Sequence, residues 1–298
     1  MDQPTSQDWI LGYATNASAA AVEPFMRSAR RWHPRPGCRI VLFVSANGAQ
    51  AVDVHALAQR YAVDLVPATS QWAGQRPLRT KIAARGALAW WRLWAPADSA
   101  AALALGAWLH PHYTRWLDYH RFLQAHPRAG KVFLSDVTDV IFQANVFERI
   151  DPHRLTIAEL PLAFDGRNID SAWMRDAAGP QRLRALMGRT VLCIGTVGGP
   201  RRRVAELCQT LWQTMCDRPF RGVEQAIFND LYYRGALGSC VLRANDGDFV
   251  LTTTSPEDCP GLALRPDGLG LGARTPAVVH MFNRLPPLWQ RALGVGLG

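Results

Sequence analysis

The sequence contains very little lysine. Of its 298 residues, 33 are Lys or Arg and 24 are Asp or Glu, which gives a formal net charge of +9. Lys81 and Lys131 are the only lysines, so the other 31 basic residues are arginines. Because a guanidinium binds phosphate and carboxylate groups through two parallel hydrogen bonds, this excess suits recognition of either group. A GC-rich genome produces the same bias, so each arginine has to be argued individually.

Long apolar segments are also missing. The segment Met1–Asp8 has no basic stretch followed by an apolar one, so we expect no signal peptide. The most apolar stretch, Ala100–Leu109, has about half the length of a membrane span. We therefore expect a soluble, cytoplasmic protein. Peripheral contact with an anionic inner-membrane surface stays open, because the five tryptophans between residues 90 and 116 suit either an interface or a buried helix pair.

Several well-known motifs are absent. The six cysteines include no C-x-x-C pair, which excludes a zinc ribbon and a thioredoxin-type motif. The glycines of Cys193–Pro200 fit neither the dinucleotide fingerprint nor a P-loop. The sequence has no G-x-S-x-G elbow, which argues against a serine hydrolase of the α/β type.

The first third of the chain alternates between apolar strands and helical segments. Strands are expected at Trp9–Ala14, Arg39–Ser45 and Val63–Pro67, with helices at Pro24–Trp32 and Val52–Tyr61 between them. This order predicts an α/β fold that begins with parallel strands and right-handed crossovers.

Residues 68–112 interrupt the alternation, because they are rich in Trp, Ala and Pro. We expect a helical insert there, within a single domain that covers residues 1–298. Further strands are expected at Lys131–Ser135, Leu155–Ala158, Val191–Ile194, Val241–Leu242 and Val278–Met281, and further helices at Tyr113–His126, Arg201–Cys216 and Val223–Tyr233.

Two carboxylates, Asp136 and Asp139, directly follow the expected strand Lys131–Ser135. In open α/β sheets, ligands bind at the carboxyl ends of the strands. Two neighbouring carboxylates repel each other unless a cation or hydrogen-bond donors compensate. A divalent metal that also binds a diphosphate meets this need. A pair of capping aspartates on a tight turn explains the spacing equally well.

Three other segments show similar features, each with an ordinary structural explanation. Cys193–Pro200 has the pattern of a strand that opens into glycines before an arginine-rich helix. Glu224 and Gln225 fall in the first turn of an expected helix, where a carboxylate also serves as a cap. His280 falls at the end of a late apolar strand, and a lone histidine is more often structural than a ligand.

Together these segments resemble the GT-A glycosyltransferases, loosely those of the glycogenin and galactosyltransferase type. That family binds a nucleotide sugar on a Rossmann-like domain through a divalent metal. The resemblance spans roughly residues 9 to 284. It implies a mixed, mostly parallel central sheet flanked by helices. It also implies transfer of a sugar from a nucleotide-diphosphate sugar to a glycan or another hydroxyl acceptor, in glycan or polysaccharide synthesis.

The resemblance also implies roles for individual residues. Asp136, Asp139 and His280 correspond to the ligands of the metal, Mn²⁺ or Mg²⁺. Glu224 belongs to an acidic-Gln pair near the sugar and the acceptor. Tyr113 and Arg115 are similar to a Y-x-R segment that contacts the donor. The residues that the resemblance places around the donor are Tyr113, Arg115, Gly195, Thr196 and Gln225.

The sequence departs from the family pattern at the carboxylate pair. The usual motif is Asp-x-Asp, whereas this chain has Asp-x-x-Asp. Asp139 matches the second family aspartate better, because an apolar pair and a loop follow it. Asp136 is then free to reach the ribose or a water on the metal. The family pattern also offers no counterpart for residues 68–112.

The stereochemical course of the transfer is left open by the sequence. An inverting transfer needs a general base near the acceptor hydroxyl, and the candidates are Glu224, Asp165 and Asp230, in that order. A retaining transfer needs no such base, because the leaving phosphate can take the proton. The glycogenin similarity favours retention.

Two further functions compete with glycosyl transfer. The irregular aspartate spacing is compatible with a GT-A-like scaffold that has no activity. The net charge and the run Arg201–Arg203 are compatible with a basic nucleic-acid-binding protein. No stacking platform or known nucleic-acid motif accompanies the arginines, so we expect no nucleic-acid partner.

Overall fold

The structure is a computed structural model of the chain, and it describes residues 7–15, 17–45, 50–70, 86, 110–217, 223–254 and 259–293. Most of the expected insert at 68–112, including Lys81, lies outside the described residues. None of the helices in the described part combines the length and the apolar character that crossing a membrane requires.

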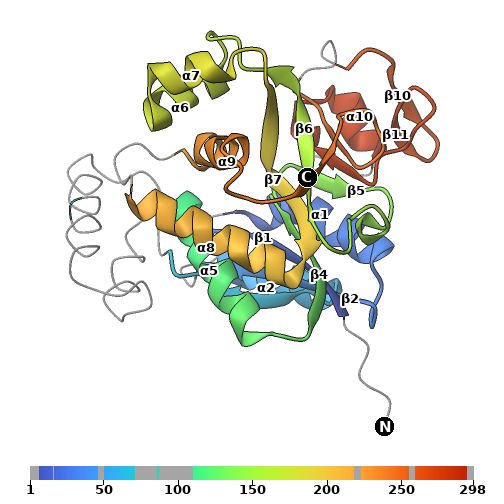
Figure 1. Cartoon of the computed structure of the whole chain (residues 1–298). Coiled ribbons are helices and arrows are strands. Elements are labelled where there is room, and N and C mark those ends of the chain that lie inside the picture. The colour runs from blue at the N-terminus through green and yellow to red at the C-terminus, as the bar shows by residue number, and fades with distance from the viewer. Residues whose placement is uncertain are drawn as a thin grey trace.

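A seven-stranded mixed sheet forms the centre of the molecule (Figure 1). Its order is β3-β2-β1-β4-β7-β6-β8, and only β7 runs antiparallel to its two neighbours. The mostly parallel sheet and the parallel start are therefore confirmed. The strands are β1 (Gln7–Tyr13), β2 (Cys38–Val44), β3 (Asp64–Pro67), β4 (Ala129–Ser135), β6 (Leu155–Ala163), β7 (Thr190–Pro200) and β8 (Cys240–Arg243).

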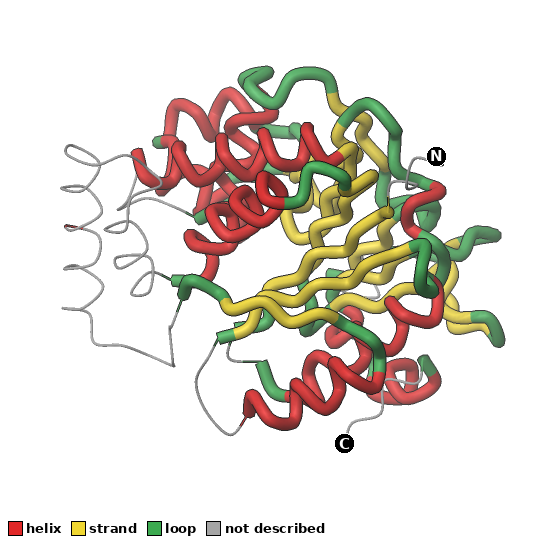
Figure 2. The backbone as a smooth tube through the Cα atoms, turned by 90° about the horizontal axis from the view of Figure 1, so that it is seen from below, coloured by secondary structure: helices red, strands yellow, loops and turns green. Residues whose placement is uncertain are grey.

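Helices lie on both sides of this sheet (Figure 2). Four consecutive residues of β2, from Ile40 to Phe43, are each at most 2% exposed. Because successive side chains point to opposite faces, such a run is stable only where both faces are covered. The helices are α1 (Ala19–Trp32), α2 (Gln50–Arg60), α5 (Pro111–Ala125), α6 (Ile169–Ala178), α7 (Pro180–Leu186), α8 (Arg201–Asp217), α9 (Glu224–Tyr233) and α10 (Pro287–Ala292).

A second, three-stranded sheet lies beside the first. It consists of β5 (Val140–Phe142), β12 (Val278–His280) and β9 (Val250–Thr252), with β12 in the middle. In the antiparallel pairing of β5 with β12, Val140 lies opposite His280. The remaining elements are the hairpin β10 (Leu262–Arg265) and β11 (Gly268–Leu271), and the 3₁₀ turns Val146–Glu148 and Phe282–Arg284.

Strand β7 differs from the expectation. The glycines of Cys193–Pro200 were expected to lie beyond the end of a strand, but β7 runs through them to Pro200 and α8 begins at Arg201. A Cβ on Gly198 would lie 2.5 Å from the side chain of Ile150, and one on Gly199 would lie 3.2 Å from that of Leu155. These two glycines therefore allow close packing in the core and do not form a ligand-binding loop.

Candidate functional site

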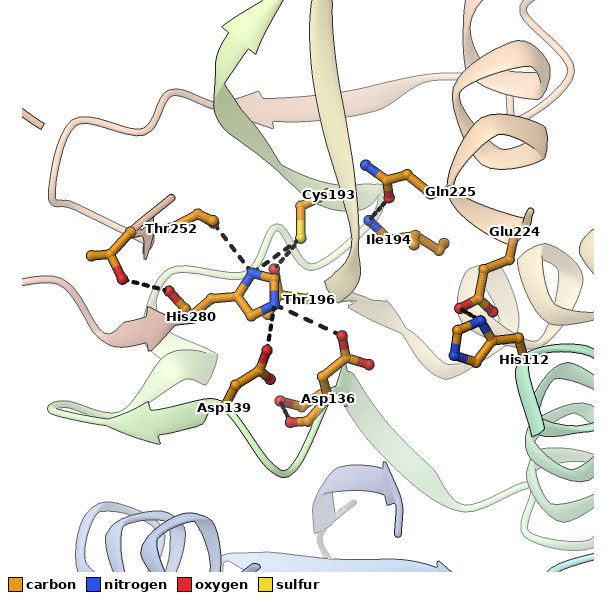
Figure 3. Close-up of polar contacts among 12 residues, drawn as sticks. His112, Asp136, Asp139, Cys193, Ile194, Thr196, Glu224, Gln225, Thr252 and His280 are labelled. Atoms are coloured by element: carbon orange, nitrogen blue, oxygen red, sulfur yellow. Dashed lines mark hydrogen bonds and ion pairs between the residues drawn. The ribbon is translucent and has the colours of Figure 1, made fainter. Parts of the chain in front are cut away.

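Asp136, Asp139 and His280 lie together at the carboxyl end of β4 (Figure 3). Asp136 directly follows β4, Asp139 precedes β5, and His280 ends β12. The distance from His280 Nε2 is 3.8 Å to Asp136 Oδ2 and 3.9 Å to Asp139 Oδ2. One possible ligand atom from each residue lies within 4.8 Å of the others. The pairing of β5 with β12 brings the histidine, which lies 141 positions after Asp139 in the chain, to the aspartates.

Two buried polar atoms of this cluster have no hydrogen-bond partner among the described residues: His280 Nε2 and Asp139 Oδ1. The other ring nitrogen of His280 is held, since Nδ1 lies 3.3 Å from Thr252 Oγ1 and 3.5 Å from Cys193 Sγ. These contacts fix the ring with Nε2 directed at the carboxylates. Buried polar atoms without partners are costly, and a cation between them would remove that cost. The cluster can therefore hold a metal ion.

Gly195 provides room for this arrangement. It lies on β7 next to β4, where the backbone N–H of Asp136 donates to its carbonyl at 2.8 Å. A Cβ on Gly195 would collide with the Asp136 carboxylate and would lie 3.3 Å from His280 Cε1. Any larger residue would displace one of the expected metal ligands.

The electrostatics of the three residues differ. Burial alone would raise the pKa of Asp136, but the Arg115 guanidinium and His280 outweigh it and hold that pKa well below its usual value. Burial raises the pKa of Asp139; His280 opposes this rise and the Asp136 carboxylate adds to it. Burial alone would lower the pKa of His280, but Cys193 and the two carboxylates raise it.

Arg115 connects this cluster to Glu224. Its Nε and Nη2 atoms lie 2.8 Å from the two oxygens of Glu224, and its Nη1 donates to Asp136 Oδ1 at 2.7 Å. Glu224, the first residue of α9, also accepts a hydrogen bond from the indole of Trp116 at 2.7 Å. His112 Nδ1 lies 3.5 Å from the same carboxylate. Both Glu224 oxygens are therefore engaged.

The remaining donor-site residues lie on β7, α5 and α9. Gln225 accepts from the backbone N–H of Ile194 at 3.1 Å and donates to the Leu192 carbonyl at 3.0 Å, so it attaches α9 to β7. The hydroxyl of Thr196 lies 3.4 Å from Cys193 Sγ. Tyr113 is a buried residue of α5. Of this group, Arg115 and Gly195 contact the cluster directly.

Asp165 and Asp230 make their bonds elsewhere. Asp165 is exposed and accepts from the backbone N–H groups of Arg167 and Asn168 at 2.7 and 2.8 Å. Asp230 forms ion pairs with Arg182 at 2.6 Å and Arg234 at 2.8 Å. The structure thus brings together Asp136, Asp139, His280, Arg115 and Glu224. The carboxylates of Asp165 and Asp230 are not part of this group.

A cavity of about 340 Å³ opens beside the carboxylates. Residues 13–15 at the end of β1, the start of α5 and residues 136–139 line it. One wall is fixed by Asp118, which accepts from the Tyr13 hydroxyl at 2.7 Å and from the Thr69 backbone N–H at 2.9 Å. This network was not predicted from the sequence, because Tyr13, Thr69 and Asp118 lie far apart in the chain.

Cys193 and Thr252, the two partners of His280, were also missed as site residues. No local pattern distinguishes them from ordinary strand residues.

Models of known protein families do not match this chain, and a search of curated proteins finds no match either.

Proposed function

We propose that the chain is a metal-dependent glycosyltransferase that moves a sugar from a nucleotide-diphosphate sugar to a hydroxyl acceptor. One observation carries the proposal. Asp136, Asp139 and His280 converge at the carboxyl edge of a mixed α/β sheet, and His280 Nε2, which has no hydrogen-bond partner in the described part of the chain, is directed at the two carboxylates.

The local charge supports a divalent cation at this position. Asp136, Asp139 and Glu224 bring three negative charges, and Arg115 brings one positive charge in direct contact with two of them. With His280 neutral, as a metal ligand must be, a divalent ion balances the remaining charge. The carboxylates suit Mn²⁺ or Mg²⁺, and the imidazole favours Mn²⁺ over the harder Mg²⁺. When bound, such an ion supplies charge stabilisation for a diphosphate leaving group.

The protein side chains supply position and shape. Asp136, Asp139 and His280 would hold the ion, while Thr252 and Cys193 keep the imidazole turned toward it. The cavity beside them, bounded by the end of β1 and the start of α5, offers about 340 Å³ for the donor. Its place at the carboxyl ends of β1 and β4 is where ligands bind in open α/β sheets.

The contacts of the three predicted bases favour a retaining transfer. Both oxygens of Glu224 already accept hydrogen bonds, and Asp165 and Asp230 make their bonds outside the cluster. In a retaining transfer the leaving phosphate accepts the acceptor proton, so no side chain has to act as the base.

Ligand binding and donor hydrolysis test the proposal. A panel of nucleoside diphosphates with Mn²⁺ should raise the melting temperature, because a ligand at ~100 times its Kd stabilises the native state by about 2.7 kcal/mol. A screen of nucleotide sugars with Mn²⁺, Mg²⁺ or EDTA should show metal-dependent hydrolysis. Asp139→Ala should abolish that hydrolysis, because it removes one of the two carboxylate ligands.

The outcomes separate the alternatives. No thermal shift with any diphosphate, or full hydrolysis by Asp139→Ala, would contradict the proposal. Metal binding without turnover of any donor would instead support the non-catalytic scaffold, which the Asp-x-x-Asp spacing motivates.

A further inference from the structure

We infer that Glu224 and Arg115 are positioning residues, which set the metal affinity of the site by orienting Asp136. This inference rests on the proposed function, since it concerns the same metal site. It differs from the roles that the family resemblance implies, where Glu224 lies near the acceptor and Arg115 contacts the donor.

The geometry of Asp136 carries the first step. Its Oδ1 accepts from Arg115 Nη1 at 2.7 Å, and its Oδ2 lies on the side of His280, 3.8 Å from Nε2. One oxygen is thus fixed by the guanidinium, which leaves the other to the cation. Asp136 has a side chain that is 34% exposed, so without Arg115 it would have room to turn toward solvent.

The geometry of Arg115 carries the second step. Glu224 binds its Nε and Nη2 edge through two contacts of 2.8 Å, and the guanidinium lies 4.5 Å from the centre of the Trp116 ring. The Trp116 indole in turn donates to Glu224 at 2.7 Å. Glu224 thus holds one edge of the planar guanidinium and Trp116 covers one face, which fixes the direction of the Nη1 group. Nη1 is the atom that donates to Asp136.

The burial of Arg115 and Glu224 explains why the loss of Glu224 would change the metal affinity of the site. Arg115 is 8% exposed and Glu224 5% exposed. If Glu224 lost its charge, the buried Arg115 cation would keep only Asp136 as a close counter-ion. The guanidinium would then lose the contacts that fix its direction and turn further onto Asp136, so the carboxylate would no longer be held toward His280 and the metal. Figure 3 shows Glu224 at the start of α9, on the opposite side of Asp136 from His280.

Mn²⁺ titration of the full chain tests this inference without any turnover. We expect Glu224→Gln to weaken Mn²⁺ binding by about 10- to 100-fold, the range found when residues that orient metal ligands are replaced. Glu224→Asp should recover part of that loss. The matched control is Glu206→Gln, which makes the same chemical change in an exposed ion-pairing carboxylate of α8 and should leave Mn²⁺ binding unchanged.

Arg115→Lys provides a second variant, since lysine keeps the charge but cannot bind both Glu224 and Asp136. We expect a similar loss of affinity, and no further loss in the Glu224→Gln/Arg115→Lys double variant, because both changes break the same link. Melting curves recorded in EDTA check that each variant is folded. If Glu224→Gln does not fold, the comparison of Arg115→Lys with wild type decides.

The results distinguish this inference from the proposed function. Tight Mn²⁺ binding by Glu224→Gln together with lost transfer would overturn the inference and restore Glu224 as a catalytic base, while the metal site and the proposed function stand. A wild-type chain that binds no Mn²⁺ would overturn both.

Discussion

The site has room only for glycine at position 195, because a side chain there would collide with the Asp136 carboxylate. Gly195→Ala places a methyl group against the carboxylate of Asp136, so we expect Mn²⁺ affinity to fall by at least about tenfold. Mn²⁺ titration measures this effect. Gly37→Ala is the control, since a Cβ there lies 3.7 Å from the nearest atom, the Pro34 carbonyl oxygen, in ordinary contact. An unchanged Mn²⁺ affinity in Gly195→Ala would show that Asp136 is not a ligand.

His33 gives the fold a dependence on pH. Its Nε2 accepts the backbone N–H of Val146 at 3.0 Å and its Nδ1 lies 2.8 Å from the Ala29 carbonyl oxygen, so the ring fits this site only in its neutral form. Burial lowers the pKa of His33 from 6.5 to about 4, and the Arg30 cation adds to the decrease.

The sign of this effect follows from proton binding. Between pH 6.5 and 4 the unfolded chain binds a proton at His33 that the native chain does not. The stabilisation is therefore complete above pH 6.5 and falls as the pH decreases, by about 3 kcal/mol in total. Urea unfolding at pH 7, 6 and 5 measures it. The His33→Gln variant should lack this contribution, and parallel pH profiles for the two chains would contradict the assignment.

At the scale of elements, Asn229 joins α9 to β7. Its carboxamide accepts from the Leu192 N–H at 2.8 Å and donates to the Leu192 carbonyl at 2.9 Å, and the residue is fully buried. Asn229→Ala leaves the buried Leu192 N–H without its partner, while the Leu192 carbonyl keeps the hydrogen bond from Gln225. We therefore expect a loss of about 1 to 3 kcal/mol in the free energy of unfolding. Urea unfolding measures the loss. Gln209→Ala, on the exposed face of α8, should change it by less than about 0.5 kcal/mol.

The elements that were predicted correctly share strong local patterns. The continuous apolar runs of β1, β2 and β4 are visible in the sequence because both faces of these strands are covered. The extent of β7 was predicted incorrectly, because its glycines suggest a turn when the chain is considered alone. They belong to a strand because Ile150 and Leu155 pack against their bare α-carbons.

Short elements near the site were not predicted at all. Strand β9, which supplies Thr252, has only three residues and pairs with β12, 28 positions later in the chain. Helix α6, which packs against α9, and helix α7, which packs against α6, are also short and are separated only by Gly179. Such elements are stabilised by packing on their neighbours, so local propensity carries little information about them.

At the scale of the whole molecule, many of the arginines have structural partners. Arg30 donates to the carbonyls of His33, Cys38, Tyr61 and Ala62, and it thereby joins the ends of α1 and α2. In the run Arg201–Arg203, the first residue donates to the Leu123 carbonyl, and the other two pair with Glu206. These contacts support a structural explanation for the run and give no support to a nucleic-acid-binding surface.

The amino-acid sequence was enough to predict the α/β class, the parallel start of the sheet and the position of Asp136 and Asp139 at a strand end. These features depend on apolar periodicity and on residues that are neighbours in the chain. The contacts that these aspartates make with distant groups depend on the packing of the whole chain. Strand pairing brings His280 to the aspartates, and the packing of α5 and α9 against α8 brings Glu224 to Arg115. Contacts between residues far apart in the chain depend on register and burial, which no local pattern encodes.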